Sequence, residues 1–119
     1  MPLDESDAAF IWDMLRHAQI IVRMTQGMTK AAYVDDERTR FAIERLVEII
    51  GEAAGDVSDT ARALAPEVPW RKIIGQRHVL AHEYGAIDHE RMWTVASERI
   101  PELITALERL LAHAPPTSP

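Results

Sequence analysis

The spacing of apolar residues constrains the fold of this 119-residue chain more than any other feature. Apolar residues that recur every three or four positions lie on one face of an α-helix. The first such segment runs from about Asp7 to Gly27; residues 4–7 offer helix-capping side chains, and Gly27 can end the helix. Its apolar face consists of Phe10, Ile11, Met14, Leu15, Ala18, Ile21 and Met24. This segment therefore predicts a long amphipathic helix.

A second helix is predicted from about Asp36 to Ala54, and its apolar surface is wide. At 100° per residue the apolar sector covers about 160°, more than the roughly 100° that a one-sided surface helix needs. The sector contains Ala42, Ile43, Leu46, Val47, Ile49, Ile50, Ala53 and Ala54. We expect this helix to contact both its own bundle and something else.

Prolines divide the middle of the chain. A short helix is predicted at about residues 58–65. The third main helix should begin at Pro69 or Trp70, because proline is tolerated in a first turn. It should run to Tyr84, with Gly85 as its C-terminal cap.

The last main helix is predicted from Asp88, a good N-cap, to about Ala112. Pro101 should kink or split it near Ile100, because proline lacks an N–H group and its ring obstructs the preceding turn. The tail, residues 113–119, is rich in proline and is predicted to be disordered.

These segments predict an all-α fold, with residues 1–112 forming one helical domain. The simplest architecture is an antiparallel bundle of four main helices plus a short helix, with a kinked last helix. Neither internal repeats nor strand-like alternation is present in the sequence.

Composition and charge exclude several classes of protein. The chain has no cysteine, which excludes disulfides and thiolate metal sites and fits a cytoplasmic protein. No apolar run of about 18 residues predicts a membrane helix, and the N-terminus is acidic where a signal peptide is basic. The net charge of −6 argues against a surface that grips duplex DNA, although it allows one phosphate to be bound in a local pocket.

Arg77 lies in the middle of the apolar sector of the third helix. Ile73, Leu80 and Tyr84 flank it on one side of the helical wheel, and Ile74 and Ala81 flank it on the other. A buried arginine needs an acidic partner, an anion or a route to water. It could extend to the rim of the bundle, pair with a carboxylate such as Glu52, or bind an anion.

His78 and His82 are four residues apart, a spacing that suits two zinc ligands on one helix. However, Val79 stands where zinc enzymes with this spacing carry a glutamate. No third ligand is apparent in the sequence, although three residues could serve: Glu83, His89 and His113. We therefore expect no metal and no other cofactor.

Arg77 and His82 together suit phosphodiester chemistry. A guanidinium binds a phosphate through two hydrogen bonds and stabilises the charge that builds up on it. An imidazole, with a pKa near 6.5, can take a proton from a ribose 2′-hydroxyl or give one to the leaving oxygen. The two residues lie about 140° apart on one helix, so a two-fold dimer would bring them together better than a monomer.

The spacing Arg77, four residues, His82, one residue, Tyr84 resembles the Arg-x4-His-x-Tyr signature of the HepT-like toxins. These form a branch of the HEPN superfamily, small all-α proteins that act as metal-independent ribonucleases. The resemblance extends from about Asp13 to Leu107. It includes 48-EIIGEAA-54, Pro69-Trp70 with Ile73 and Gly75, 84-YGAID-88, Trp93 and 100-IPEL-103.

This resemblance implies a homodimeric endoribonuclease toxin with Arg77 and His82 as the catalytic pair and RNA, either tRNA or mRNA, as substrate. It also implies a partner, a minimal nucleotidyltransferase antitoxin that silences the nuclease by attaching AMP to Tyr84. The family often has asparagine where this chain has His78, which could keep a supporting polar role.

Two other interpretations stay open. The chain could be a non-catalytic HEPN module that binds a nucleotide or the partner nucleotidyltransferase, which the acidic net charge and His78 favour. It could also be a structural bundle in which Arg77 is incidental.

Overall fold

A computed structural model describes residues 3–75 and 87–113, and every regular element in these two ranges is a helix. This confirms the predicted all-α fold. The elements are α1 (Glu5–Thr25), α2 (Lys30–Asp35), α3 (Glu37–Asp56), α4 (Asp59–Ala63), a helical segment at residues 70–75, α6 (His89–Thr94), the π-helical turn η2 (Val95–Arg99) and α7 (Ile100–Leu111). No helix in these ranges is both long and apolar enough to cross a bilayer.

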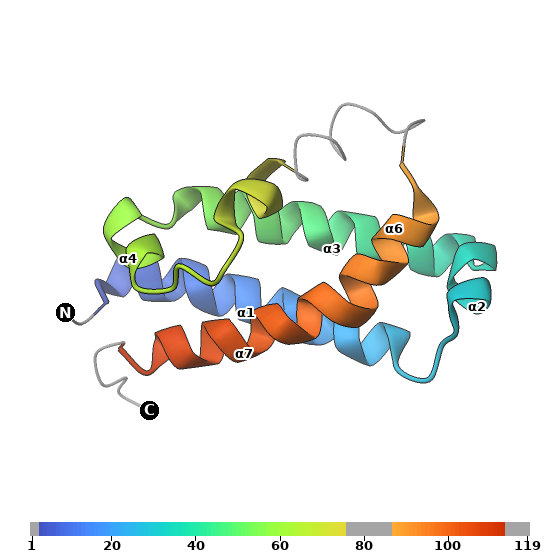
Figure 1. The fold of residues 1–119 in the computed structure, drawn as a ribbon, viewed down its shortest axis with the longest axis horizontal. Helices are drawn as coiled ribbons and strands as arrows, with labels where there is room; N and C mark the ends of the chain where they lie inside the picture. Colours follow the sequence, from blue (N-terminus) through green and yellow to red (C-terminus); the bar gives the residue numbers. More distant parts are fainter. Residues whose placement is uncertain (1–2, 76–86, 114–119) are drawn as a thin grey trace.

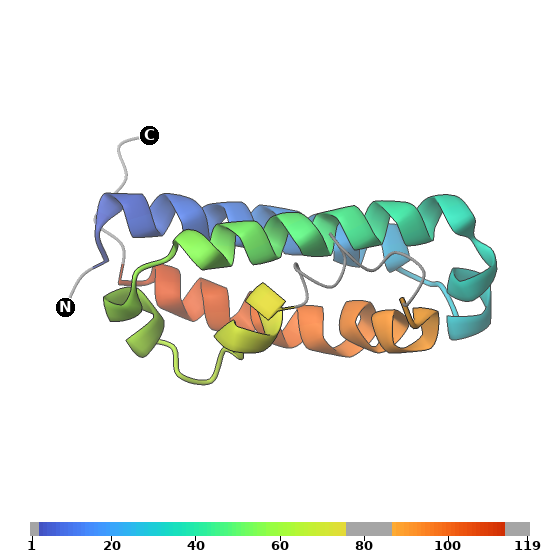
Figure 2. The ribbon, with the colours of Figure 1, turned by 90° about the horizontal axis from the view of Figure 1, so that it is seen from above.

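The helices form two layers. Helices α1 and α3 run antiparallel and side by side (Figures 1 and 2). The continuous run α6–η2–α7 lies across them as the second layer, with α7 antiparallel to α1 (Figure 2). This matches the antiparallel bundle that the sequence predicts.

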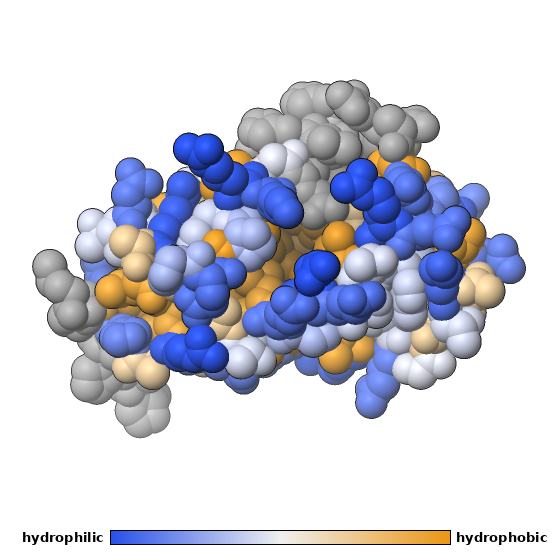
Figure 3. All heavy atoms as spheres, viewed as in Figure 1, coloured by the Kyte–Doolittle hydropathy of each residue, from blue (hydrophilic) through white to orange (hydrophobic). Residues whose placement is uncertain are grey.

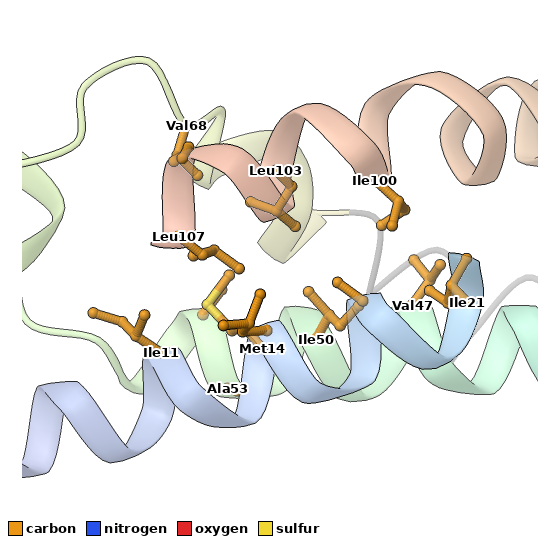
Figure 4. Close-up of a cluster of buried hydrophobic side chains, with 14 of the residues drawn as sticks. Ile11, Met14, Ile21, Val47, Ile50, Ala53, Val68, Ile100, Leu103 and Leu107 are labelled. Carbon is orange, nitrogen blue, oxygen red and sulfur yellow. The ribbon is translucent and has the colours of Figure 1, made fainter. Parts of the chain in front are cut away.

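The hydrophobic core fills the space between the layers. Figure 4 shows Ile11 and Met14 of α1 meeting Leu107 of α7, with Val47 and Ile50 contributed by α3. The predicted apolar faces are largely buried: Ile11, Met14, Leu15, Ala18, Ile21, Ile43, Val47, Ile50, Ala53, Ala54, Leu103, Leu107 and Leu110. Met24, expected on the same face, is 39% exposed, and Thr25 is the buried residue at the end of α1.

Local capping chemistry sets where the helices begin and end. The side chains of Asp36, Ser58 and Asp88 each accept a backbone N–H in the first turn of their helices. The cap at Asp88 was predicted from the sequence. Helix α1 ends at Thr25, and Gly27 then takes a positive φ of 79°, which glycine adopts without steric cost.

Helix α2 was not predicted from the sequence. Its six residues are too few to show a helical period. Thr29 caps it, and Tyr33 holds it to the bundle by being completely buried.

The predicted last helix is interrupted at η2, just before Pro101. The N–H of Ile100 donates to the carbonyl of Val95, five residues back, instead of four. Pro101 has no N–H to donate to the carbonyl of Ser97, so an ordinary α-turn here would lose a hydrogen bond. The interruption keeps Met92 of α6 and Leu103 of α7 on the core side.

The third predicted helix is described only through Gly75. Its first residue, Trp70, is buried, and its indole N–H donates to the carbonyl of Ala65 at 3.1 Å. This hydrogen bond fixes the chain where it enters the helix. The rest of that helix and residues 114–119 of the tail lie outside the described residues.

Candidate functional site

The four residues singled out in the sequence, Arg77, His78, His82 and Tyr84, all lie outside the described residues. The structure does describe the chain on both sides of them, up to Gly75 and again from Ile87. These two flanks define the surroundings of the motif.

A cleft opens between the flanks of the motif. Its volume is about 1150 Å³, above the roughly 300–1,000 Å³ of a pocket for a drug-sized ligand. Gly75 and Ile87, the described residues on either side of the motif in the chain, both line it. Apolar side chains from three directions form its inner wall: Val47, Ile50, Ile73, Ile100 and Leu103. Figure 3 shows this hollow with apolar atoms in its depth.

Lys72 and Arg91 bring positive charge to the cleft. Within the ranges 3–75 and 87–113, neither forms an ion pair with a carboxylate. Lys72 comes from the helix that leads into the motif, and Arg91 comes from α6, which lies after the motif in the chain. Two cations that line one cleft can both contact a phosphate-bearing ligand.

The carboxylates that line the cleft have partners of their own. Glu67 accepts from Arg109 at 2.8 Å, and Glu102 accepts from Arg99 at 3.2 Å. Asp88 accepts the backbone N–H groups of the first turn of α6. Arginines therefore pair with Glu67 and Glu102, whereas Asp88 caps α6.

A second polar cluster lies where α3 meets the start of α6. Nη1 of Arg40 is 2.7 Å from Nε2 of His89, and Nδ1 of His89 is 3.7 Å from a carboxylate oxygen of Glu44. Arg40 and Glu44 are one turn apart on α3, whereas His89 is the first residue of α6. We call these three residues the Arg40–Glu44–His89 cluster.

Burial changes the acid–base properties beside this cluster. Desolvation raises the pKa of Glu44 above its ordinary value, while electrostatic interactions with His89 and Arg40 work against that rise. Burial, together with the negative charge of Glu44, also raises the pKa of Tyr33. Both groups are therefore biased towards their protonated forms.

Helix α6 is also tied to α2. Lys30 and Glu90 form an ion pair at 3.3 Å, and the rings of Tyr33 and Trp93 pack with centroids 5.4 Å apart. Together with the Arg40–Glu44–His89 cluster, these contacts hold the start of α6 against two other helices.

Sequence reasoning did not identify this cluster. It considered His89 only as a possible third zinc ligand. Arg40 and Glu44 do share one helix face, a spacing visible in the sequence. Their partner, however, is 49 residues away from Arg40, and no local pattern indicates such a pairing.

Comparison with known proteins identifies the class to which this helical fold and its motif belong. The family described as Ribonuclease HepT-like matches residues 14–110, and the chain is a member of that family. This confirms the resemblance drawn from the Arg-x4-His-x-Tyr spacing.

Three relatives match this chain over most of their own length. "Probable ribonuclease HepT" of Thermococcus cleftensis is 31% identical over 108 residues, covering 91% of this chain and 98% of that protein. "Putative RNase MJ1380" of Methanocaldococcus jannaschii is 31% identical over 100 residues, covering 84% and 92%. "Putative RNase TTE0752" of Caldanaerobacter subterraneus is 28% identical, covering 86% and 91%. No solved structure gives a significant match.

Proposed function

We propose that this chain is a metal-independent endoribonuclease toxin that acts as a homodimer in the cytoplasm. The observation that carries the proposal is the cleft lined by Lys72 and Arg91 and by Gly75 and Ile87, which flank the Arg77–Tyr84 motif in the sequence. Membership of the ribonuclease family supports RNA as the substrate. Either tRNA or mRNA would supply the phosphates.

In the proposed reaction, Arg77 binds the phosphate and His82 takes the proton of the ribose 2′-hydroxyl. The 2′-oxygen then attacks phosphorus, and the bond from phosphorus to the 5′-oxygen breaks. The leaving oxygen gains a proton from the His82 of the second copy in the dimer. The products are a 2′,3′-cyclic phosphate and a 5′-hydroxyl, and neither protein nor substrate is oxidised or reduced.

A cleavage assay tests this mechanism. The purified protein should cut RNA in the presence of EDTA, and Arg77→Ala and His82→Ala should lower the rate by at least about a hundredfold. Arg71→Ala is the matched control, because Arg71 is exposed on the helix that leads into the motif. Products that end in a 3′-hydroxyl, or motif variants as active as wild type, would contradict the assignment.

We further propose that a nucleotidyltransferase antitoxin silences the nuclease by attaching AMP to Tyr84. The added phosphates would compete with RNA for Arg77. Intact mass after co-expression with such a partner should show AMP-sized additions that Tyr84→Phe removes. Tyr33→Phe is the control, since Tyr33 is the only other tyrosine and is fully buried. Additions that survive Tyr84→Phe would place the modification elsewhere.

The shared catalytic cleft requires a dimer. Light scattering should give twice the mass of one chain at micromolar concentration, and a monomer would remove the support for a shared site. The wide apolar sector of α3 favours a dimer, because Ala42, Leu46 and Ile49 are only partly buried by the chain itself.

A non-catalytic module that binds a nucleotide or the nucleotidyltransferase is the second candidate. It is favoured by the net charge of −6 and by His78 in place of the family's asparagine. It predicts binding without cleavage in the same assay. His78→Asn separates the two: a rise in cleavage would mean that His78 weakens an otherwise competent nuclease.

A further inference from the structure

The Arg40–Glu44–His89 cluster joins parts of the chain that only the fold brings together. Glu44 keeps 11% of its side-chain surface and His89 keeps 35%. Nε of Arg40, a carboxylate oxygen of Glu44, Nδ1 of His89 and the hydroxyl of Tyr33 are enclosed and have no hydrogen-bond partner among the described residues. Enclosed polar atoms without partners are costly, and such costs often mark a functional constraint.

The hydrogen bond to Arg40 determines the protonation state of the His89 ring. A guanidinium has only N–H donors, so Nε2 of His89 must accept from Arg40. The ring is therefore neutral, and its proton is on Nδ1. That N–H faces the carboxylate of Glu44, and the two atoms are 3.7 Å apart, slightly longer than a hydrogen bond.

The contact between His89 and Arg40 lies just after the nuclease motif in the sequence. His89 comes five residues after Tyr84 and seven after His82. We propose that His89 is a positioning residue: in its neutral form it docks the chain beyond the nuclease motif onto Arg40 of α3, and so sets where His82 and Tyr84 lie. This inference rests on the proposed ribonuclease function.

The docking depends on the protonation of His89. A proton on Nε2 removes the acceptor and places a cation 2.7 Å from Arg40. Among the described residues, the other ionisable groups on the elements at this contact are Glu44 on α3, Tyr33 and Lys30 on α2, and Glu90, which follows His89 in α6. Protonated His89 would turn from Arg40 towards Glu44.

Three variants separate positioning from general stability. His89→Ala and Arg40→Ala both remove the contact and should lower kcat about 10- to 100-fold, with KM changed less, because a small misplacement of catalytic groups has that effect. His89→Gln keeps an acceptor for Arg40 but cannot be protonated, so it should restore kcat to within about threefold of wild type. The double variant Arg40→Ala/His89→Ala should be no slower than either single variant.

Hydrogen exchange tests the positioning role of His89 without RNA, so it applies even if the protein has no nuclease activity. Hydrogen exchange of the peptide covering residues 76–88 should be several-fold faster in Arg40→Ala than in wild type, with α1 unchanged. If wild type is inactive but this difference appears, the proposed function fails and the docking stands. If His89→Gln is as slow as His89→Ala, or exchange in that peptide does not change, the positioning role is wrong.

Discussion

At the scale of single residues, Asp7 joins the start of α1 to the start of α4. Its carboxylate accepts from the backbone N–H of Ser58 at 2.8 Å and from the Ser58 hydroxyl at 2.7 Å. Asp7 is largely buried, so these bonds satisfy a carboxylate that has little contact with water. We expect Asp7→Ala to lower the free energy of unfolding by about 1–2 kcal/mol, the cost of losing hydrogen bonds to a charged acceptor.

Urea denaturation measures this loss, and Asp59→Ala provides the comparison. Asp59 is fully exposed and lies 3.8 Å from Arg62, so its removal should change stability far less. Equal effects of the two substitutions would mean that the Asp7–Ser58 contact contributes little.

Glu44 should make stability depend on pH in an unusual direction for a carboxylate. Desolvation raises its pKa in the folded state, so the folded protein holds this proton more tightly than the unfolded chain does. Stability should therefore fall as the pH rises from about 4.3, the ordinary glutamate pKa, through the higher folded value. Glu44→Gln should remove this decline in urea midpoints measured from pH 4 to 7.

Glu48→Gln is the matched control for that titration. Glu48 lies one turn further along α3 and pairs with the exposed Arg45 at 2.7 Å. It should leave the decline in place, and a decline that persists in Glu44→Gln would mean that another group causes it.

At the scale of elements, the π-helical turn raises the question of whether Pro101 or packing maintains it. Restoring an N–H at this position could add one hydrogen bond, worth about 1 kcal/mol. An α-turn would rotate α6 by about 100° and take Met92 out of the core, at a cost of about 1.5–3 kcal/mol. Packing of Met92 therefore contributes more than Pro101 to keeping the π-helical turn.

Pro101→Ala should accordingly keep the turn. We expect the free energy of unfolding to change by less than about 1 kcal/mol, and NMR should still find the five-residue spacing between Val95 and Ile100. Leu107→Ala is the contrasting change, because Leu107 is completely buried and its truncation should cost about 2–5 kcal/mol. An ordinary α-turn in Pro101→Ala would show that the proline alone imposes the π geometry.

The sequence predicts those helices whose boundaries depend on residues close together in the chain. The starts at Asp36, Ser58 and Asp88 are predictable because these side chains cap their own first turn. Helix α2 could not be predicted, because its stability comes from Tyr33 packing on Trp93, sixty residues away in the chain. The same holds for His89, whose partners are known only from the fold. Arg77, His82 and Tyr84 remain sequence-based predictions.

At the scale of the whole molecule, a chain with a net charge of −6 must attract RNA through local positive charge. Binding to single-stranded RNA should weaken with salt, with a slope of about −0.7 for each phosphate contact on a logarithmic plot. Measured in a His82→Ala background to prevent cleavage, Lys72→Gln and Arg91→Gln should each reduce the slope by about 0.7. Arg16→Gln, on the exposed face of α1, should not.

The pairing of α1 with α7 has a consequence for synthesis in the cell. Leu107 and Leu110 of α7 are almost completely enclosed, and they close the core over a helix made some ninety residues earlier. Ribosomes add about 5–20 residues per second, so α1 waits for several seconds without its partner. A nascent chain cannot complete this fold until α7 has emerged from the ribosome. Prematurely terminated products would expose apolar surface for degradation instead of releasing an active nuclease.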